Sequence, residues 1–130
     1  RAMREVPAAT LVIAGEGPER GALEALAREC GVAERTHLLG WRDDPGALLA
    51  GCDVFCASSR HEPLGNMVLE AWSAARPVVA AAAQGPRELI RDGATGLLVP
   101  LESPRALAAG LNAVLAGPMT AVGPGASAHY

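Results

Sequence analysis

The sequence predicts an α/β fold built on a doubly wound parallel sheet, and three observations support this. Short apolar segments alternate with helical segments along the 130 residues. Each expected strand is apolar throughout, as in strands whose two faces are both covered. Half of the residues are apolar, which is enough for one core in a chain of this length. Because right-handed crossovers bring the carboxyl ends of parallel strands to one edge, the loops after the strands should share that edge.

The first strand is expected at 10–14, an apolar run that ends in Gly15. The turn Gly15–Pro18 should lead into a helix, because proline suits a first helical turn. Gly31 is expected to end this helix. The second strand is expected at 36–39.

A polar loop follows at 41–44, and Asp43 or Asp44 should cap a short helix over 45–50. The third strand is expected at 54–57, where valine, phenylalanine, cysteine and alanine follow one another.

The second half of the chain repeats the alternation. A helix is expected from about 65 to 75, a strand at 77–80 and a short helix at 86–91. The fifth strand is expected at 96–99, and Ser103 should cap the last helix.

Charge and cysteine usage exclude several classes of protein. The net charge is −3 and the acidic and basic residues are interspersed, which argues against a nucleic-acid partner. The longest apolar runs are far too short to span a bilayer. Cys30, Cys52 and Cys56 are odd in number and irregularly spaced, so they predict neither a disulfide framework nor a zinc site. We expect them to be small core residues in a reducing cytoplasm.

The segment 15–21, Gly-Glu-Gly-Pro-Glu-Arg-Gly, imitates the glycine-rich turn of dinucleotide-binding proteins. Its spacing is one residue too long, and Pro18 removes a backbone donor. No acidic residue clearly ends the next strand, so NAD binding is disfavoured.

The strongest candidate site is the run from Glu62 to Glu70. Gly65 should open a helix whose first free amides form an anion site. Glu70 lies one turn along the same face as Asn66, among apolar neighbours. A carboxylate there needs a partner, and the paired hydroxyls of a ribose would serve.

Structural alternatives remain for these residues. Glu70 could pair with an arginine such as Arg76 or cap a neighbouring loop, and Glu62 could be a solvated loop charge. Arg60 could contact a phosphate or form a surface salt bridge. His61 is expected to be a solvated loop histidine, and Trp72 a core residue.

Glu62, seven residues and Glu70 together resemble the E-x7-E motif of retaining GT-B glycosyltransferases, notably glycosyltransferase family 4 (group 1). The resemblance covers about residues 8–116, in order and at the family's spacings. The further segments that carry it are 14–18, 39–41, 77–80 and 92–100. It implies the Rossmann-like, C-terminal half of a GT-B fold, which binds the nucleotide-sugar donor.

The resemblance also implies roles for individual residues. Glu62 would be the catalytic residue beside the donor sugar, and Glu70 would hold the ribose. The remaining donor-binding residues fall into three groups: Gly65, Asn66 and Met67 at the diphosphate or sugar through their backbone amides, Gly15, Gly17 and Pro18 in a turn facing the cleft, and Trp41 and Arg42 near the nucleobase.

The implied donor is a UDP-, GDP- or ADP-sugar, with no cofactor and no bound metal, because protein donors stabilise the leaving diphosphate. The implied acceptor is a saccharide or a lipid-linked saccharide, bound through an N-terminal domain. The resemblance points to bacterial cell-envelope polysaccharide synthesis in the cytoplasm, with peripheral association of the full enzyme at the inner face of the membrane.

The sequence departs from the family pattern in two respects. Ala75 stands where the family has glycine, which predicts local strain if the turn needs a positive φ. The family's first strand, with its arginine and lysine, and the acceptor domain are not in the sequence, so we expect a domain cut at both ends. Residues 1–116 would be the partial donor domain and 117–130 a poorly ordered tail rich in Gly, Pro and Ala. The alternatives are a non-catalytic nucleotide-binding remnant and a nucleotide-sugar epimerase.

Overall fold

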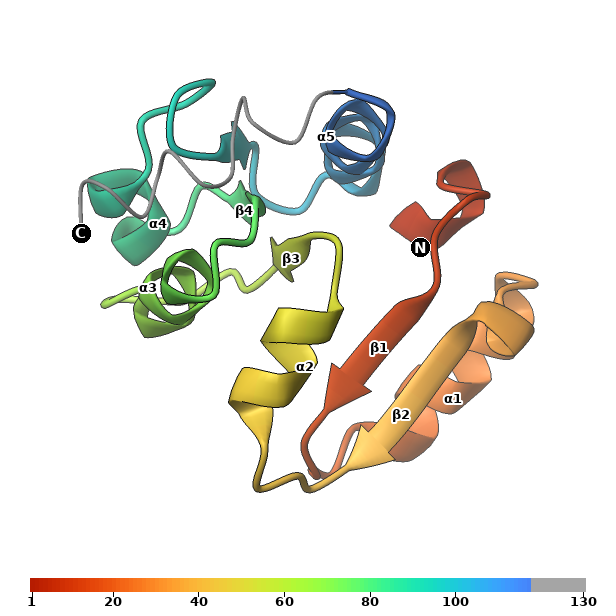
Figure 1. The fold of residues 1–130 in the computed structure, drawn as a ribbon. Coiled ribbons are helices and arrows are strands. Elements are labelled where there is room, and N and C mark those ends of the chain that lie inside the picture. The colour runs from red at the N-terminus through yellow and green to blue at the C-terminus, as the bar shows by residue number, and fades with distance from the viewer. Residues whose placement is uncertain (118–130) are drawn as a thin grey trace. The chain divides into compact units, whose positions relative to one another are not determined.

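The computed structural model describes residues 1–117 (Figure 1). The expected tail lies outside the described residues from position 118 onward. The chain divides into two compact units, Arg1–Pro45 and a second that begins at Gly46. The predicted α/β class is confirmed, because helices alternate with strands and all strand pairs are parallel.

The strands form two sheets rather than the single sheet expected from the sequence. The order is β1-β2 in the first unit and β3-β4-β5 in the second. Hydrophobic pattern predicts where strands occur but not which strands pair, because pairing depends on residues far apart in the sequence. In each sheet the strands are parallel, so the loops that follow them start at the carboxyl edge of that sheet.

The first unit holds two strands and three helical segments: η1 (Ala2–Glu5), β1 (Leu11–Ala14), α1 (Arg20–Glu29), η2 (Ala33–Arg35) and β2 (Thr36–Gly40). Met3, Ala27 and Val32 form its buried cluster. The short η1 was not expected from the sequence, since four residues carry too little pattern to reveal a helical turn. The helix α1 begins two residues after Pro18, because Arg20 N–H closes a turn on the carbonyl of Gly17 at 3.3 Å.

The guanidinium group of Arg35 forms hydrogen bonds to the segment that precedes β1. Nη1 donates to the carbonyl oxygens of Val6 at 2.9 Å and Ala9 at 2.8 Å, and Nη2 donates to that of Met3 at 3.0 Å. The carbonyls of Met3 and Val6 also accept backbone N–H bonds, so Arg35 adds a second donor to these two and a donor to that of Ala9.

The second unit holds three strands and four helices: α2 (Pro45–Gly51), β3 (Phe55–Ala57), α3 (Asn66–Ser73), β4 (Val78–Ala81), α4 (Gln84–Leu89), β5 (Leu97–Val99) and α5 (Pro104–Ala116). Ser103 caps α5 as predicted, because its Oγ accepts from the amide of Ala106 at 3.2 Å. Capping of α2 by Asp43 or Asp44 stays a prediction, and the two carboxylate oxygens of Asp44 accept hydrogen bonds from Arg42. The helix α4 starts two residues before the expected Pro86, which the first turn of a helix tolerates.

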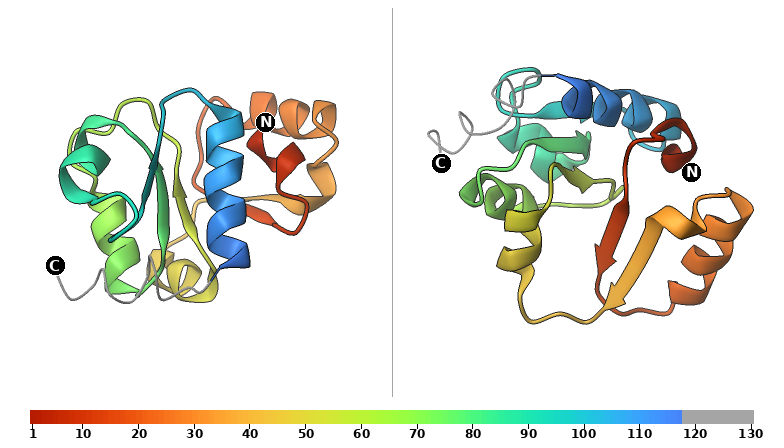
Figure 2. Two further views of the ribbon diagram at one scale, coloured as in Figure 1. Left: turned by 90° about the horizontal axis from the view of Figure 1, so that it is seen from above. Right: turned by 45° about the vertical axis from the view of Figure 1, so that its right-hand side comes forward.

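The strand β4 is fully buried, and its side chains alternate between two layers of helices. Val78 and Ala80 belong to the core cluster with Trp72 of α3. Val79 faces α5, where a Cβ on Gly110 would lie 3.0 Å from its Cγ1. Figure 2 (left) shows α3 and α5 on opposite sides of the strands. The predicted covering of both sheet faces is therefore confirmed for β4.

The turn between α3 and β4 has the strain foreseen from the sequence. Ala75 adopts φ 54, in the left-handed region that favours glycine. Trp72 is a core residue as expected, with 4% of its surface exposed. Among the described residues, no helix is both long enough and apolar enough to cross a bilayer.

Candidate functional site

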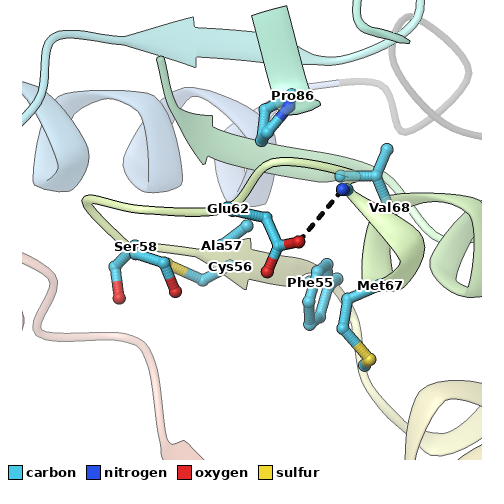
Figure 3. A pocket seen from close by; sticks show the side chains of 10 residues that line it. Phe55, Cys56, Ala57, Ser58, Glu62, Met67, Val68 and Pro86 are labelled. Carbon is cyan, nitrogen blue, oxygen red and sulfur yellow. Dashed lines mark hydrogen bonds between the residues drawn. The ribbon is translucent and has the colours of Figure 1, made fainter. Parts of the chain in front are cut away.

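A pocket of about 150 Å³ opens at the carboxyl end of β3 (Figure 3). The strand and the loop after it contribute residues 55–59 and Glu62 to its wall. The start of α3 contributes Gly65, Met67 and Val68, and α4 contributes Pro86. Three of the predicted site residues, Glu62, Gly65 and Met67, are therefore brought together in one wall.

Two hydrogen bonds hold Glu62 in this wall. Its Oε1 accepts from the backbone N–H of Gly65 at 3.0 Å (Figure 3). Its main-chain carbonyl accepts from the N–H of Gly85 at 2.7 Å. A solvated loop charge, the structural alternative, is therefore wrong: the carboxylate is half-buried and bound to the turn that precedes α3.

Gly65 makes the turn possible because its backbone is left-handed, with φ 73. It immediately precedes α3, so the amides of Asn66 and Met67 have no acceptor within the helix. The Gly65 N–H already binds Glu62. Of the three amides expected to meet a diphosphate, those of Asn66 and Met67 are thus the ones that the helix leaves open.

The pocket suits a neutral ligand with hydroxyl groups better than an anion. Glu62 is the only charged residue among the pocket-lining residues described, and Ser58 and Ser59 add two hydroxyls. A carboxylate accepts hydrogen bonds from hydroxyl groups but repels phosphate. Ser58 and Ser59 were not predicted as site residues; the signal available in the sequence was their position directly after the third expected strand.

Cys56 lines the same pocket and stays protonated at neutral pH. Burial raises the pKa of its thiol to about 11. The three cysteines of the described chain are free thiols and are half-buried, so they act as small packing residues, as predicted.

Glu70 lies one turn along α3, exposed and outside the pocket wall. The expected alternative, a pair with Arg76, is wrong. Arg76 donates instead to the carbonyl oxygens of Ala74 at 3.2 Å and Cys52 at 3.1 Å. Among the described residues Glu70 forms no salt bridge, so its carboxylate is available to a ligand.

The other five predicted residues belong to the first unit. Gly15 donates its N–H to the carbonyl of Gly40 at 2.7 Å, next to the exposed turn that holds Gly17 and Pro18. Trp41 is 79% exposed, so its ring is accessible for stacking.

Arg42 is paired with Asp44 rather than free. Its Nε donates to Oδ1 at 2.8 Å and its Nη2 to Oδ2 at 2.6 Å. The side-chain hydrogen bonds raise the pKa of Arg42 and lower that of Asp44. A ligand that uses Arg42 would share it with this carboxylate.

Arg60 forms the surface salt bridge that was one of its two predicted roles. Its Nη1 lies 2.8 Å from Oε1 of Glu102, and both side chains are exposed. His61, next to it, is exposed as expected.

The described chain is similar to known proteins along nearly its whole length. The family model of group 1 glycosyl transferases matches residues 1–117. The lipopolysaccharide core biosynthesis glycosyltransferase LpsE of Rhizobium meliloti is 40% identical over 115 residues, which cover 88% of this chain and 34% of LpsE. The α-D-kanosaminyltransferase of Streptomyces kanamyceticus is 38% identical over 92 residues, which cover 24% of that protein. The chain thus spans about a third or less of the curated relatives it matches.

Solved structures show the same similarity. Anabaena HepE in complex with UDP-glucose matches with a TM-score of 0.91 at 28% identity, over 98% of this chain and 38% of that one. WaaG, a glycosyltransferase involved in lipopolysaccharide biosynthesis, matches with a TM-score of 0.80 at 27% identity, over 98% of this chain and 34% of that one. These matches confirm the predicted GT-B type of α/β fold.

Proposed function

The chain belongs to the group 1 glycosyltransferase family, and from that membership we propose that it binds the nucleotide-diphosphate sugar donor of a retaining glycosyl transfer. The observation that carries the proposal is the Glu62 carboxylate, held by Gly65 at the start of α3 and facing a pocket of about 150 Å³. In this proposal the chain is of the family 4 type, with Glu62 and Glu70 as its E-x7-E motif.

The pocket would take the sugar, because it offers a carboxylate and two serine hydroxyls to hydroxyl groups. The amides of Asn66 and Met67 would take the diphosphate, since a helix N-terminus favours anions. Glu70, exposed and without an ion pair within residues 1–117, would bind the ribose. Trp41 and Arg42 would lie near the base, and the turn Gly15–Pro18 would face the donor.

The chemistry would be breakage of the bond between the anomeric carbon and the diphosphate, with the acceptor oxygen bonding to the same face of the sugar. The helix amides would stabilise the leaving diphosphate without a metal ion. A uridine nucleotide is supported by the solved neighbours at 28% identity that were crystallised with UDP or UDP-glucose.

The acceptor would be a saccharide or a lipid-linked saccharide of the bacterial cell envelope, in keeping with the names of LpsE and WaaG. We place the whole protein in the cytoplasm, with peripheral association at the inner face of the membrane.

Ligand-observed NMR of the purified chain with UDP, GDP, ADP and NAD tests the proposal. We expect one nucleoside diphosphate to bind, Glu70→Ala to abolish the signal and Glu29→Ala to leave it unchanged. Glu29 is a matched control because it is an exposed glutamate at the end of α1. A folded chain that binds none of the four nucleotides would contradict the proposal and favour a non-binding remnant. Preferential binding of NAD would favour an epimerase.

A further inference from the structure

The backbone of Gly85 lies against the turn that carries Glu62. A Cβ built on Gly85 would lie 2.5 Å from the amide nitrogen of Gly65, 2.7 Å from the carbonyl oxygen of Glu62 and 2.7 Å from the carbonyl carbon of Leu64. All three are backbone atoms, which cannot rotate away as the end of a side chain can. A side chain at position 85 would therefore push the turn 62–65 outward.

The contact is close from the other side as well. A Cβ built on Gly65 would lie 3.2 Å from the carbonyl carbon of Gly85 and 2.8 Å from Cδ1 of Leu89. The two glycine backbones thus pack directly on each other, and the Gly85 N–H donates to the Glu62 carbonyl at 2.7 Å. This contact joins the loop after β3 to the first turn of α4.

The position of the Glu62 carboxylate depends on this turn, because Oε1 is bound to the Gly65 N–H at 3.0 Å. We propose that Gly85 is a positioning residue that acts through the turn 62–65: its lack of a side chain lets this turn pack against α4, which sets the start of α3 and holds the Glu62 carboxylate in the pocket. The inference rests on the proposed function of the pocket, to which it adds a residue outside the pocket lining.

Two other groups in the second unit make the test selective. The Trp72 indole Nε1–H donates to the carbonyl of Thr95 at 3.0 Å in the core, so its resonance reports the fold. Gly110 provides a matched control, because its Cβ would also be crowded, 3.0 Å from Cγ1 of Val79. It lies on α5, on the side of the sheet away from α3 (Figure 2).

The experiment compares Gly85→Ala with Gly110→Ala in the 130-residue chain by amide NMR and UDP titration. We expect Gly85→Ala to move the Gly65 amide resonance, to leave the Trp72 indole resonance in place and to weaken UDP binding by roughly tenfold or more, because small displacements of a site carry large effects. Gly110→Ala should change neither the Gly65 resonance nor the affinity. Glu62→Ala should move the Gly65 resonance as well, and Glu62→Gln, which keeps an oxygen acceptor, should largely restore it.

An unmoved Gly65 resonance with unchanged UDP affinity in Gly85→Ala would overturn the inference, as would an equal loss of affinity in Gly110→Ala. If Gly85→Ala does not fold, hydrogen exchange of the wild-type chain decides. The Gly85 and Gly65 amides should then be slowed together by UDP while that of Gly110 is not, and an unaffected Gly85 amide overturns the inference. If the wild-type chain binds no nucleotide, the proposed function fails, whereas the Gly65 resonance of the unliganded variants still tests the positioning.

Discussion

The indole Nε1 of Trp72 donates a hydrogen bond of 3.0 Å to the carbonyl oxygen of Thr95, and this bond ties α3 to the loop before β5. The Thr95 side chain turns back in the same loop, where its Oγ1 accepts from the amide of Arg91 at 2.9 Å. One buried aromatic residue thus connects α3, the helix of the candidate site, to the loop before β5.

Trp72→Phe should destabilise the chain by about 2–3 kcal/mol, because it leaves the Thr95 carbonyl without its partner and opens a cavity in the core. Urea unfolding followed by far-UV circular dichroism measures this. Trp41→Phe is the matched control: Trp41 is 79% exposed against 4% for Trp72, so its change should stay within about 0.5 kcal/mol. Equal effects of the two substitutions would contradict the packing described.

Ala75→Gly should stabilise the chain by about 0.5–1 kcal/mol. Ala75 has φ 54, where an alanine costs roughly 1–2 kcal/mol and a glycine pays only its larger loss of chain entropy. Ala74→Gly, with φ −88 at the neighbouring position, should instead cost about 0.5–1 kcal/mol. Thermal unfolding of both variants shows whether each substitution raises or lowers the stability. A fall in stability for Ala75→Gly would show that the turn carries no strain.

Arg35→Lys should destabilise the first unit by about 1–3 kcal/mol, since an ammonium group cannot reproduce a planar fork that serves three carbonyls. Faster hydrogen exchange along β1 would localise the effect. Arg28→Lys, on the exposed face of α1, should change neither property measurably. The role assigned to Arg35 fails if the two lysine variants behave alike.

Stability should fall between about pH 9 and 11 because of Cys56. Its pKa is about 11 in the folded chain against an ordinary 9.0, since burial disfavours the thiolate. The folded chain therefore holds this proton more tightly than the unfolded chain does. The contribution of Cys56 to the free energy of unfolding is complete below pH 9. It is lost as the pH rises through 11, which lowers that free energy by about 2–3 kcal/mol in all.

Cys56→Ala should reduce the fall in the free energy of unfolding over this pH range. Cys52, whose thiol pKa is also raised by burial, is present in both proteins, so it cancels from the comparison. Urea midpoints at a series of pH values provide the measurement, and parallel curves for the two proteins would contradict the assignment.

The order and type of the main elements could be predicted from the sequence because they follow from local pattern. Ser103 before an apolar helix and the short apolar run of β4 are both signals of this kind. The division into two sheets could not be predicted in the same way, because it depends on which strands pair, and paired strands lie far apart in the sequence. The helical turn η1 was too short to leave a pattern.

In the candidate site, too, features set by neighbouring residues could be predicted, whereas contacts between residues far apart in the sequence could not. The spacing of Glu62 and Glu70 predicted the region of the candidate site, and the glycine before α3 predicted the start of that helix. The contact between Gly85 and the turn 62–65 joins residues about twenty positions apart, which no periodicity encodes. The choice between the two roles of Arg60 likewise needed Glu102, more than forty residues away.

Within each sheet, every strand pairs with the next strand of that sheet in the chain, Leu11 with Thr36, Phe55 with Val78 and Val79 with Leu97. The loops that must close are therefore short, and the entropic cost of closing them is small. Parallel pairing is slow by nature, but here each ladder closes only one crossover connection, so it can form as soon as its second strand exists. On the ribosome, the ladder of the first unit could thus be complete while the segment from Gly46 onward is still being translated.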